Sequence, residues 1–319
     1  MQLGLETAVA LALGLAVGAA APVRGVLLAG AAPAARFALR VGITLLGARL
    51  TLGQLVDTGG ASVVAIVAVV AVGLVLGTVL ARRLAVRAPL SALITVGMAI
   101  CGNSAILALS PIIGAKHRET AYAVSTITIF GLIGVLLLPV VGRVLGLPEA
   151  VFGTWAGLAV NDTAQVVATG YAFSAPAGDV ATVVKLTRNI AILPVLLGAT
   201  WLAVRAATAD ASTISAGSTW RLVASAVPWF VIGFVVVAGL RSAGLLDGEL
   251  WGDSLAELFQ GAAMVLILVA LAGVGISTDV RAMLGVGARP FLLGASMWVV
   301  IGLLGLVLAM VLVESRAVV

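Results

Sequence analysis

Long apolar segments, separated by short polar connections, run through the whole chain. A helix that crosses a bilayer needs roughly 20 apolar residues, and about ten segments reach that length. In order, these segments are 3–22, 38–56, 61–81, 89–113, 120–142, 150–172, 179–204, 222–241, 256–279 and 290–313. The pattern predicts an all-α, polytopic membrane protein of about ten transmembrane helices.

The composition supports a membrane protein without a soluble domain. Of the 319 residues, 62% are hydrophobic and 10% are charged, and the mean hydropathy is +1.24. Segment 3–22 has no basic region before it, so we interpret it as a retained helix rather than a signal peptide. We predict a single integral membrane domain over residues 1–319. The stretch of small polar residues at 206–220 is a candidate boundary between two halves.

The net charge of +5 comes largely from arginines at the ends of the apolar segments. Aromatic residues do not alternate with these cations as they do on nucleic-acid-binding surfaces, so no nucleic-acid partner is expected. The cations fall in alternate connections, which the positive-inside rule places in the cytoplasm, with Lys116-His117-Arg118 as an exception. We therefore expect a multi-pass protein of the inner (cell) membrane, in contact with lipid, with both termini outside the cytoplasm.

Few residues are suited to catalytic or cofactor chemistry. One cysteine and one histidine exclude an intrachain disulfide and a multi-cysteine metal site, and no nucleotide-binding motif is present, so no cofactor is expected. An intramembrane enzyme with Ser104 or Cys101 as nucleophile is a remote alternative, since no base is evident beside either residue. The sequence therefore favours a protein that is not an enzyme.

Two polar clusters interrupt membrane-length apolar segments: Cys101-Gly102-Asn103-Ser104 and Asn161-Asp162-Thr163-Ala164-Gln165. In hydrocarbon every backbone polar group needs a partner, so such interruptions are tolerated only where they face protein or a wet cavity. A second long segment follows each cluster. After the cluster at 161–165, we expect a turn at 176–178 before that segment. Paired interrupted helices indicate a secondary transporter with structural repeats, and we expect the two interrupted helices to cross near mid-membrane.

The first cluster is a candidate substrate site. A helix that restarts at Gly102 presents free amides and the positive end of its dipole, which attract an anion. Asn103 and Ser104 are candidate ligands beside Gly102. The alternative is a helix that packs through Gly102 and Ser104 while Asn103 makes an interhelical hydrogen bond.

Asp162 is the key residue of the second cluster. A carboxylate inside a span persists by protonation, by pairing or by binding a cation. We interpret Asp162 and Asn161 as the site of a coupling proton or Na⁺, with Thr163 and Gln165 as substrate ligands. The alternative is a structural ion pair of Asp162 with Lys185 or Arg188.

Lys185 and Arg188 share one helix face, with Asn189 one position further round. Counted from Asp179 they lie roughly 9 and 14 Å along the helix, which places them inside the bundle. Two buried cations beside one acid leave a positive excess that suits an anionic substrate, and we interpret all three residues as substrate ligands. The alternative is a neutralised structural cluster with Asp162 and Asp179.

Three segments resemble the hallmark motifs of the YeiH-type proteins, a family to which sulfate export is attributed. These segments are 99–105 (AICGNSA), 161–168 (NDTAQVVA) and 178–189 (GDVATVVKLTRN). The resemblance implies a fold related to bile acid sodium symporters, with a panel domain and a core domain that contains two unwound, crossing helices. It also implies sulfate, sulfite or a sulfonate as substrate. One departure is Asn161, where many relatives carry a histidine, so a titrating histidine is not assumed.

Together these observations predict a secondary active transporter of a small anion, working by alternating access and coupled to a proton or Na⁺. A cation/proton antiporter that uses Asp162 is the nearest alternative, with Lys185 or Arg188 stabilising the crossed helix ends. A homo-oligomer is left open.

Overall fold

The computed structural model describes residues 24–191, 229–250, 253–277 and 287–317, together with scattered positions among 9–17 and 194–199. These residues are helical almost throughout. Strand pairing in this part of the chain is limited to β1 (Glu249–Leu250) against β2 (Asp253–Ser254). The all-α prediction is confirmed, whereas the boundary expected at 206–220 lies outside the described residues.

Within the described ranges, four helices are long and apolar enough to cross a membrane: α3 (Leu52–Arg83), α6 (His117–Val144), α13 (Leu255–Ser277) and α15 (Ala288–Ala317). Their outward faces carry large apolar side chains such as Val64, Val140 and Leu303, which are 76%, 58% and 61% exposed. Such faces suit lipid rather than water. The total of about ten spans stays a prediction.

Two segments that the hydropathy pattern marks as single spans are each two short helices. Segment 89–113 contains α4 (Leu90–Ala99) and α5 (Asn103–Ile112). Segment 150–172 contains α7 (Glu149–Ala159) and α8 (Thr163–Phe173). The predicted interruptions are confirmed at both polar clusters, while the internal repeat stays a prediction.

The span predicted at 38–56 is wrong in its bounds. Helix α2 (Arg24–Leu46) begins earlier and ends in the short 3₁₀ helix η2 (Gly47–Arg49). Thr51 then starts α3 by accepting the backbone N–H of Gln54, whose side chain accepts the N–H of Thr51 in return. This reciprocal cap separates two helices that hydropathy alone joins.

The turn predicted at 176–178 is also wrong, because these residues form the first turns of α9 (Ala175–Ile190). The Ser174 hydroxyl accepts the N–H of Ala177 at 3.2 Å and caps the helix. Proline is compatible with the first turn, where its missing N–H costs no hydrogen bond, so Pro176 does not mark a break.

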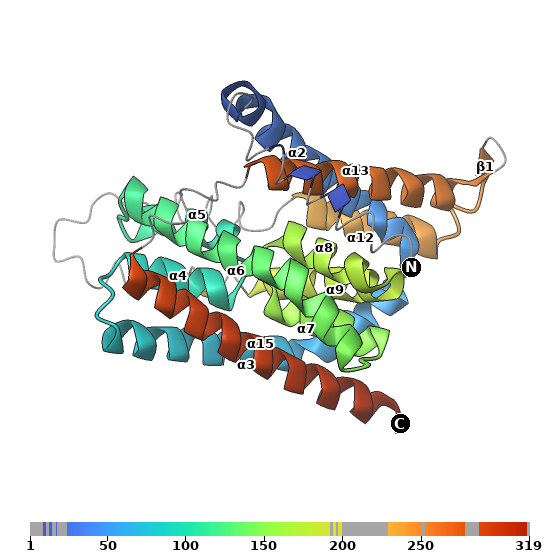
Figure 1. Ribbon diagram of the computed structural model, residues 1–319. Coiled ribbons are helices and arrows are strands. Elements are labelled where there is room, and N and C mark those ends of the chain that lie inside the picture. The colour runs from blue at the N-terminus through green and yellow to red at the C-terminus, as the bar shows by residue number, and fades with distance from the viewer. Residues whose placement is uncertain are drawn as a thin grey trace.

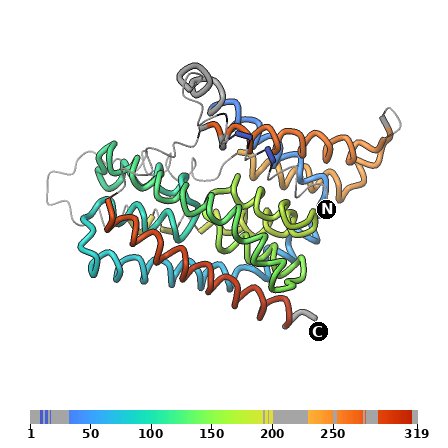
Figure 2. The backbone as a smooth tube through the Cα atoms, in the orientation of Figure 1, coloured from blue at the N-terminus to red at the C-terminus, as the bar shows by residue number. Residues whose placement is uncertain are grey.

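The helices pack into two units (Figure 1). The small unit contains α2, η2, α12 (Trp229–Ser242) and α13, and the blue α2 lies along the orange α13 in Figures 1 and 2. The large unit contains α3 to α9 and α15, in which α9 packs on α7 and α8, and α15 packs on α7 and α3. Both interrupted pairs, α4/α5 and α7/α8, belong to the large unit.

Candidate functional site: a crossing of two interrupted helices

The two interruptions meet backbone to backbone. Gly102 has φ +62°, and a Cβ built on it would lie 3.2 Å from the backbone C and O of Asn161 and 3.3 Å from the N of Asp162. Glycine is needed there for its positive φ and for the close approach. Four helix ends therefore converge at this point, the C-terminal ends of α4 and α7 and the N-terminal ends of α5 and α8.

Arg188, on α9, joins the two C-terminal ends. The guanidinium is fully buried, and its acceptors among the described residues all lie at these ends. Its Nη1 lies 2.6 Å from the carbonyl O of Leu158, 3.3 Å from that of Val160 and 3.4 Å from that of Gly157. Its Nη2 lies 3.1 Å from the carbonyl O of Met98 and 3.4 Å from Asn161 Oδ1. The last carbonyls of a helix lack intrahelical partners and carry its negative dipole end, so a cation stabilises them.

Lys185 acts on the same two ends from one turn earlier on α9. Its Nζ lies 3.1 Å from the carbonyl O of Ile100 and 3.4 Å from that of Val160. The side chain is fully buried. Lys185 and Arg188 thus bind the carbonyls of both interrupted helices together, and their acceptors are backbone oxygens apart from Asn161 Oδ1.

Asp162 and Asn103 join the two N-terminal ends. Asp162 caps α8, since its Oδ1 accepts the N–H of Ala164 at 3.0 Å. Its Oδ2 accepts from Asn103 Nδ2, in the first turn of α5, at 3.3 Å. The N-cap of α5 is Gly102, which offers no side chain to the free amides there. Asp162 is therefore the carboxylate that faces both positive helix ends.

The acids do not neutralise Lys185 and Arg188 directly. Among the described residues, no ion pair joins either cation to Asp162 or Asp179, and Asp179 instead pairs with Arg49 at 3.1 Å. Counted by formal charge, two cations and one carboxylate give the crossing one excess positive charge. Of the two acids in the alternative structural cluster, Asp179 therefore binds elsewhere, whereas Asp162 lies at the crossing without a direct ion pair to either cation.

The two sides of the crossing differ in exposure. Asn161, Lys185 and Arg188 are buried, whereas Ser104 is exposed. Asn103, Asp162 and Thr163 are partly exposed. Side chains at the N-terminal ends of α5 and α8 are thus more exposed than those at the C-terminal ends of α4 and α7, and we call the side of these N-terminal ends the open face.

Two predicted ligands lie away from this open face. Gln165 is buried and donates from Nε2 to the carbonyl of Thr128 at 3.2 Å, and its side chain lies against Gly131 on α6. Asn189 is buried beyond Arg188 on α9. The side-chain oxygens of Asn103, Gln165 and Asn189 are buried and accept no hydrogen bond from the described residues.

The sequence gives no signal for the acceptors that complete this site. The backbone carbonyls of Met98, Ile100 and Leu158 carry no side-chain signature, and Met98 also contributes its sulfur, 3.1 Å from Asn161 Nδ2. One signal could have indicated helix ends as partners. Lys185 and Arg188 follow two interrupted helices, and the nearby acids are too few to pair with both.

The fold and this crossing define a helical integral membrane protein with a polar centre made of broken helices. A family model described as "Conserved hypothetical protein 698" matches residues 4–294. A UPF0324 membrane protein of Clostridium tetani is 33% identical over 258 residues, which are 79% of this chain and 73% of the relative. One of Geobacter sulfurreducens is 35% identical over 269 residues, 84% of this chain and 80% of the relative.

A third relative, a UPF0324 membrane protein of Agrobacterium fabrum, is 33% identical over 276 residues, 86% of this chain and 75% of the relative. The chain belongs to this family of UPF0324 membrane proteins, which confirms the resemblance to the YeiH type. No solved structure matches the chain. The inner membrane as its location and the outward termini stay predictions.

Proposed function

We propose that this protein is a secondary active transporter of a small anion, which works by alternating access. The observation that carries the proposal is the convergence of four helix ends at Gly102 and Asn161, inside a membrane protein. Interrupted helices are costly in a bilayer and are typical of transporter sites, where helix ends and freed backbone groups face the substrate.

The charge of the crossing favours an anion. Lys185 and Arg188 occupy the negative ends of α4 and α7, while the positive ends of α5 and α8 face one carboxylate, that of Asp162. A bound anion at the open face would complete the neutralisation that burial demands. In this proposal Gly102, Asn103, Ser104 and Thr163 supply the direct contacts, and Lys185 and Arg188 supply the field.

The substrate class and the coupling are further parts of the proposal. The family resemblance suggests sulfate, sulfite or a sulfonate, moved outward. Asp162, with Asn161 beside it, binds the coupling proton or Na⁺, because protonation or cation binding at this carboxylate would change the balance of charge that holds the anion.

A cation/proton antiporter is the second candidate, and one observation favours it. The donors of Lys185 and Arg188 end on helix carbonyls, so the two cations stabilise the crossing without needing an anion. Asp162 would then exchange a proton for Na⁺ at the open face.

The test uses purified protein in liposomes with imposed pH and Na⁺ gradients and a panel of labelled sulfate, sulfite, sulfonates and carboxylates. We expect gradient-dependent flux of at least one sulfur oxyanion. Na⁺/H⁺ exchange without flux of any anion would favour the antiporter. Absence of both activities from folded, correctly inserted protein would contradict both proposals.

A further inference from the structure

Arg49, Asp179 and Tyr171 form a polar cluster between the two units. Arg49 lies in η2 of the small unit, whereas Asp179 on α9 and Tyr171 on α8 belong to the large unit. Arg49 Nε lies 3.1 Å from Asp179 Oδ2. The Tyr171 hydroxyl donates to the other oxygen, Asp179 Oδ1. The Arg49 guanidinium also lies 5.8 Å from the centre of the Tyr171 ring, within the range of a cation–π contact.

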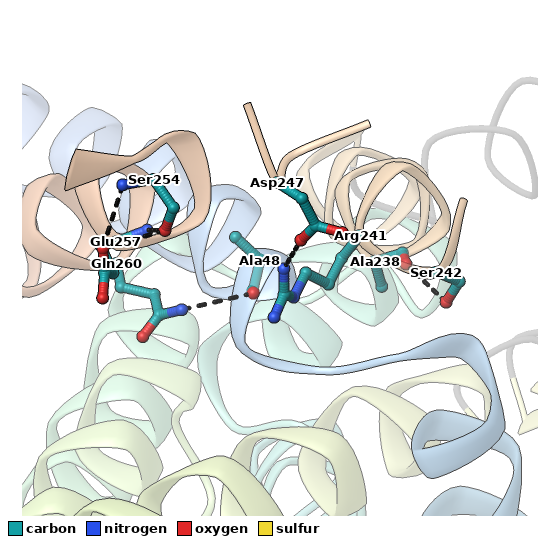
Figure 3. A network of polar contacts seen from close by, with 8 residues as sticks. All are labelled: Ala48, Ala238, Arg241, Ser242, Asp247, Ser254, Glu257 and Gln260. Carbon is teal, nitrogen blue, oxygen red and sulfur yellow. Dashed lines mark hydrogen bonds and ion pairs between the residues drawn. The ribbon is translucent and has the colours of Figure 1, made fainter. Parts of the chain in front are cut away.

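The arginine is held rigidly by the small unit. A Cβ on Gly47 would lie 2.3 Å from the carbonyl O of Phe234, so η2 packs closely on α12. On its other side, the carbonyl of Ala48 accepts from Gln260 Nε2 of α13 at 3.5 Å, as Figure 3 shows. The backbone that carries Arg49 is therefore tied to α12 and α13 and moves with them.

Asp179 is held in place by its neighbours in the large unit. Tyr171 is fully buried, and a Cβ on Gly178 would lie 2.5 Å from its ring. The ring is therefore fixed between α8 and α9, and its hydroxyl orients the carboxylate of Asp179. Because Arg49 and Tyr171 each bind a different oxygen of the Asp179 carboxylate, the contact has one specific geometry.

The surroundings of this cluster are apolar. Buried side chains from both units pack together there, among them Ile43, Leu46, Val183 and Phe234. A cleft of about 220 Å³ lies between α9, α12 and the start of α3, lined by residues such as Leu55, Leu186 and Val235. Apolar surfaces have no directional contacts to lose when they slide, whereas an arginine–carboxylate pair has one preferred geometry.

We propose that Arg49, Asp179 and Tyr171 form a latch that holds the two units in the arrangement seen here and opens when they move during the transport cycle. This role rests on the proposed function, because alternating access requires such a movement. The Arg49 and Asp179 side chains are 21% and 16% exposed. Both charges thus have an exposed side, and the proposal requires water or lipid headgroups to replace the lost partners there when the latch opens.

The test measures the separation of the two units directly. Spin labels are placed at Phe37→Cys on α2 and Val144→Cys on α6, which are 65% and 80% exposed, in a Cys101→Ala background reconstituted in lipid. Distances are recorded by pulsed electron resonance without substrate. We expect Arg49→Gln to reduce the ratio of latched to open protein by roughly three- to tenfold, the range for a partly buried ion pair.

Arg241→Gln is the matched control, because Arg241 also pairs with an aspartate, Asp247, but within the small unit (Figure 3). The distances between the two spin labels in Arg241→Gln should equal those in the parent protein. The exchanged pair Arg49→Asp with Asp179→Arg should move the ratio back toward the parent. If Arg49→Gln fails to fold, Asp179→Asn and Tyr171→Phe take its place, since each removes one contact and keeps the side-chain shape.

Superimposable distances in the parent and in every folded latch variant would overturn the latch. This outcome is separable from failure of the proposed function, because the distances are measured without any anion. A shift in Arg49→Gln from a protein that moves no anion would support the latch and contradict the transport activity. Anion transport by a protein whose latch variants show no change in distance would support the transport activity and contradict the latch.

Discussion

Arg188 makes its shortest hydrogen bond, 2.6 Å from Nη1, to the carbonyl oxygen of Leu158 rather than to a carboxylate. Its other terminal nitrogen reaches the carbonyl of Met98 on α4. One side chain thus joins the ends of two interrupted helices that lie far apart in the sequence.

Arg188→Lys should therefore destabilise the protein even though the charge is kept. A single ammonium lacks the planar fork that reaches α4 and α7 together, so buried carbonyls lose their partner. We expect the free energy of unfolding to fall by roughly 1–3 kcal/mol. Thermal unfolding in detergent measures this loss, with the exposed Arg118→Lys as a control that should stay near the parent. Weaker anion binding at unchanged stability would instead make Arg188 a direct ligand.

Gly102→Ala should disrupt the crossing. The new methyl group would meet Asn161 at 3.2 Å while the residue keeps φ +62° and ψ −125°, and a backbone in such a sparsely populated region costs a non-glycine residue about 1–3 kcal/mol. Gly114 is a control for positive φ, because its φ is +61° and nothing lies within 4 Å of its Cβ position. The temperature of thermal unfolding and the rate of transport should both fall further in Gly102→Ala than in Gly114→Ala. Equal effects would mean that the contact between the two interruptions contributes nothing.

Ser104→Ala should weaken anion binding and leave stability unchanged. Ser104 is an exposed residue in the first turn of α5, whose N-cap, Gly102, offers no side chain to the free amides. Exposed substitutions of this kind usually change stability by no more than about 0.5 kcal/mol. Binding is measured by the protection from thermal unfolding that sulfate or a sulfonate confers. Full protection of Ser104→Ala would remove this residue from the substrate site.

Hydropathy and polar interruptions were sufficient to predict the membrane class and the breaks at Gly102 and Asp162. The partners of Lys185 and Arg188 were not predictable, because backbone carbonyls at a helix end have no residue signature. Helix starts that depend on caps were also missed. Ser174 and Thr51 each begin a helix through one or two local hydrogen bonds, which hydropathy averaged over a span does not resolve.

The contact between Arg49 and Asp179 shows another limit of sequence reasoning. The two residues are far apart in the chain and belong to different units. Each looks like an ordinary charge at the end of a span, and only the packing of η2 on α12 and α13 brings Arg49 to α9.

Asp162→Asn should uncouple transport while the fold is kept. Asparagine retains an oxygen to accept the N–H of Ala164, and it is as good an N-cap as aspartate. It removes the charge that a proton or Na⁺ would neutralise. Asp162→Ala, which also loses the cap, should in addition lose about 1 kcal/mol of stability. The matched pair therefore separates coupling from structure.

The most direct measurement compares anion counterflow and gradient-driven accumulation in liposomes that contain either the parent protein or Asp162→Asn. Counterflow exchanges labelled for unlabelled anion and needs no coupling gradient, whereas accumulation needs one. We expect the parent to perform both and Asp162→Asn to retain counterflow while losing accumulation. A parent protein that moves no sulfur oxyanion in either assay, or an Asp162→Asn variant that accumulates anion as the parent does, would contradict coupled anion transport at this crossing.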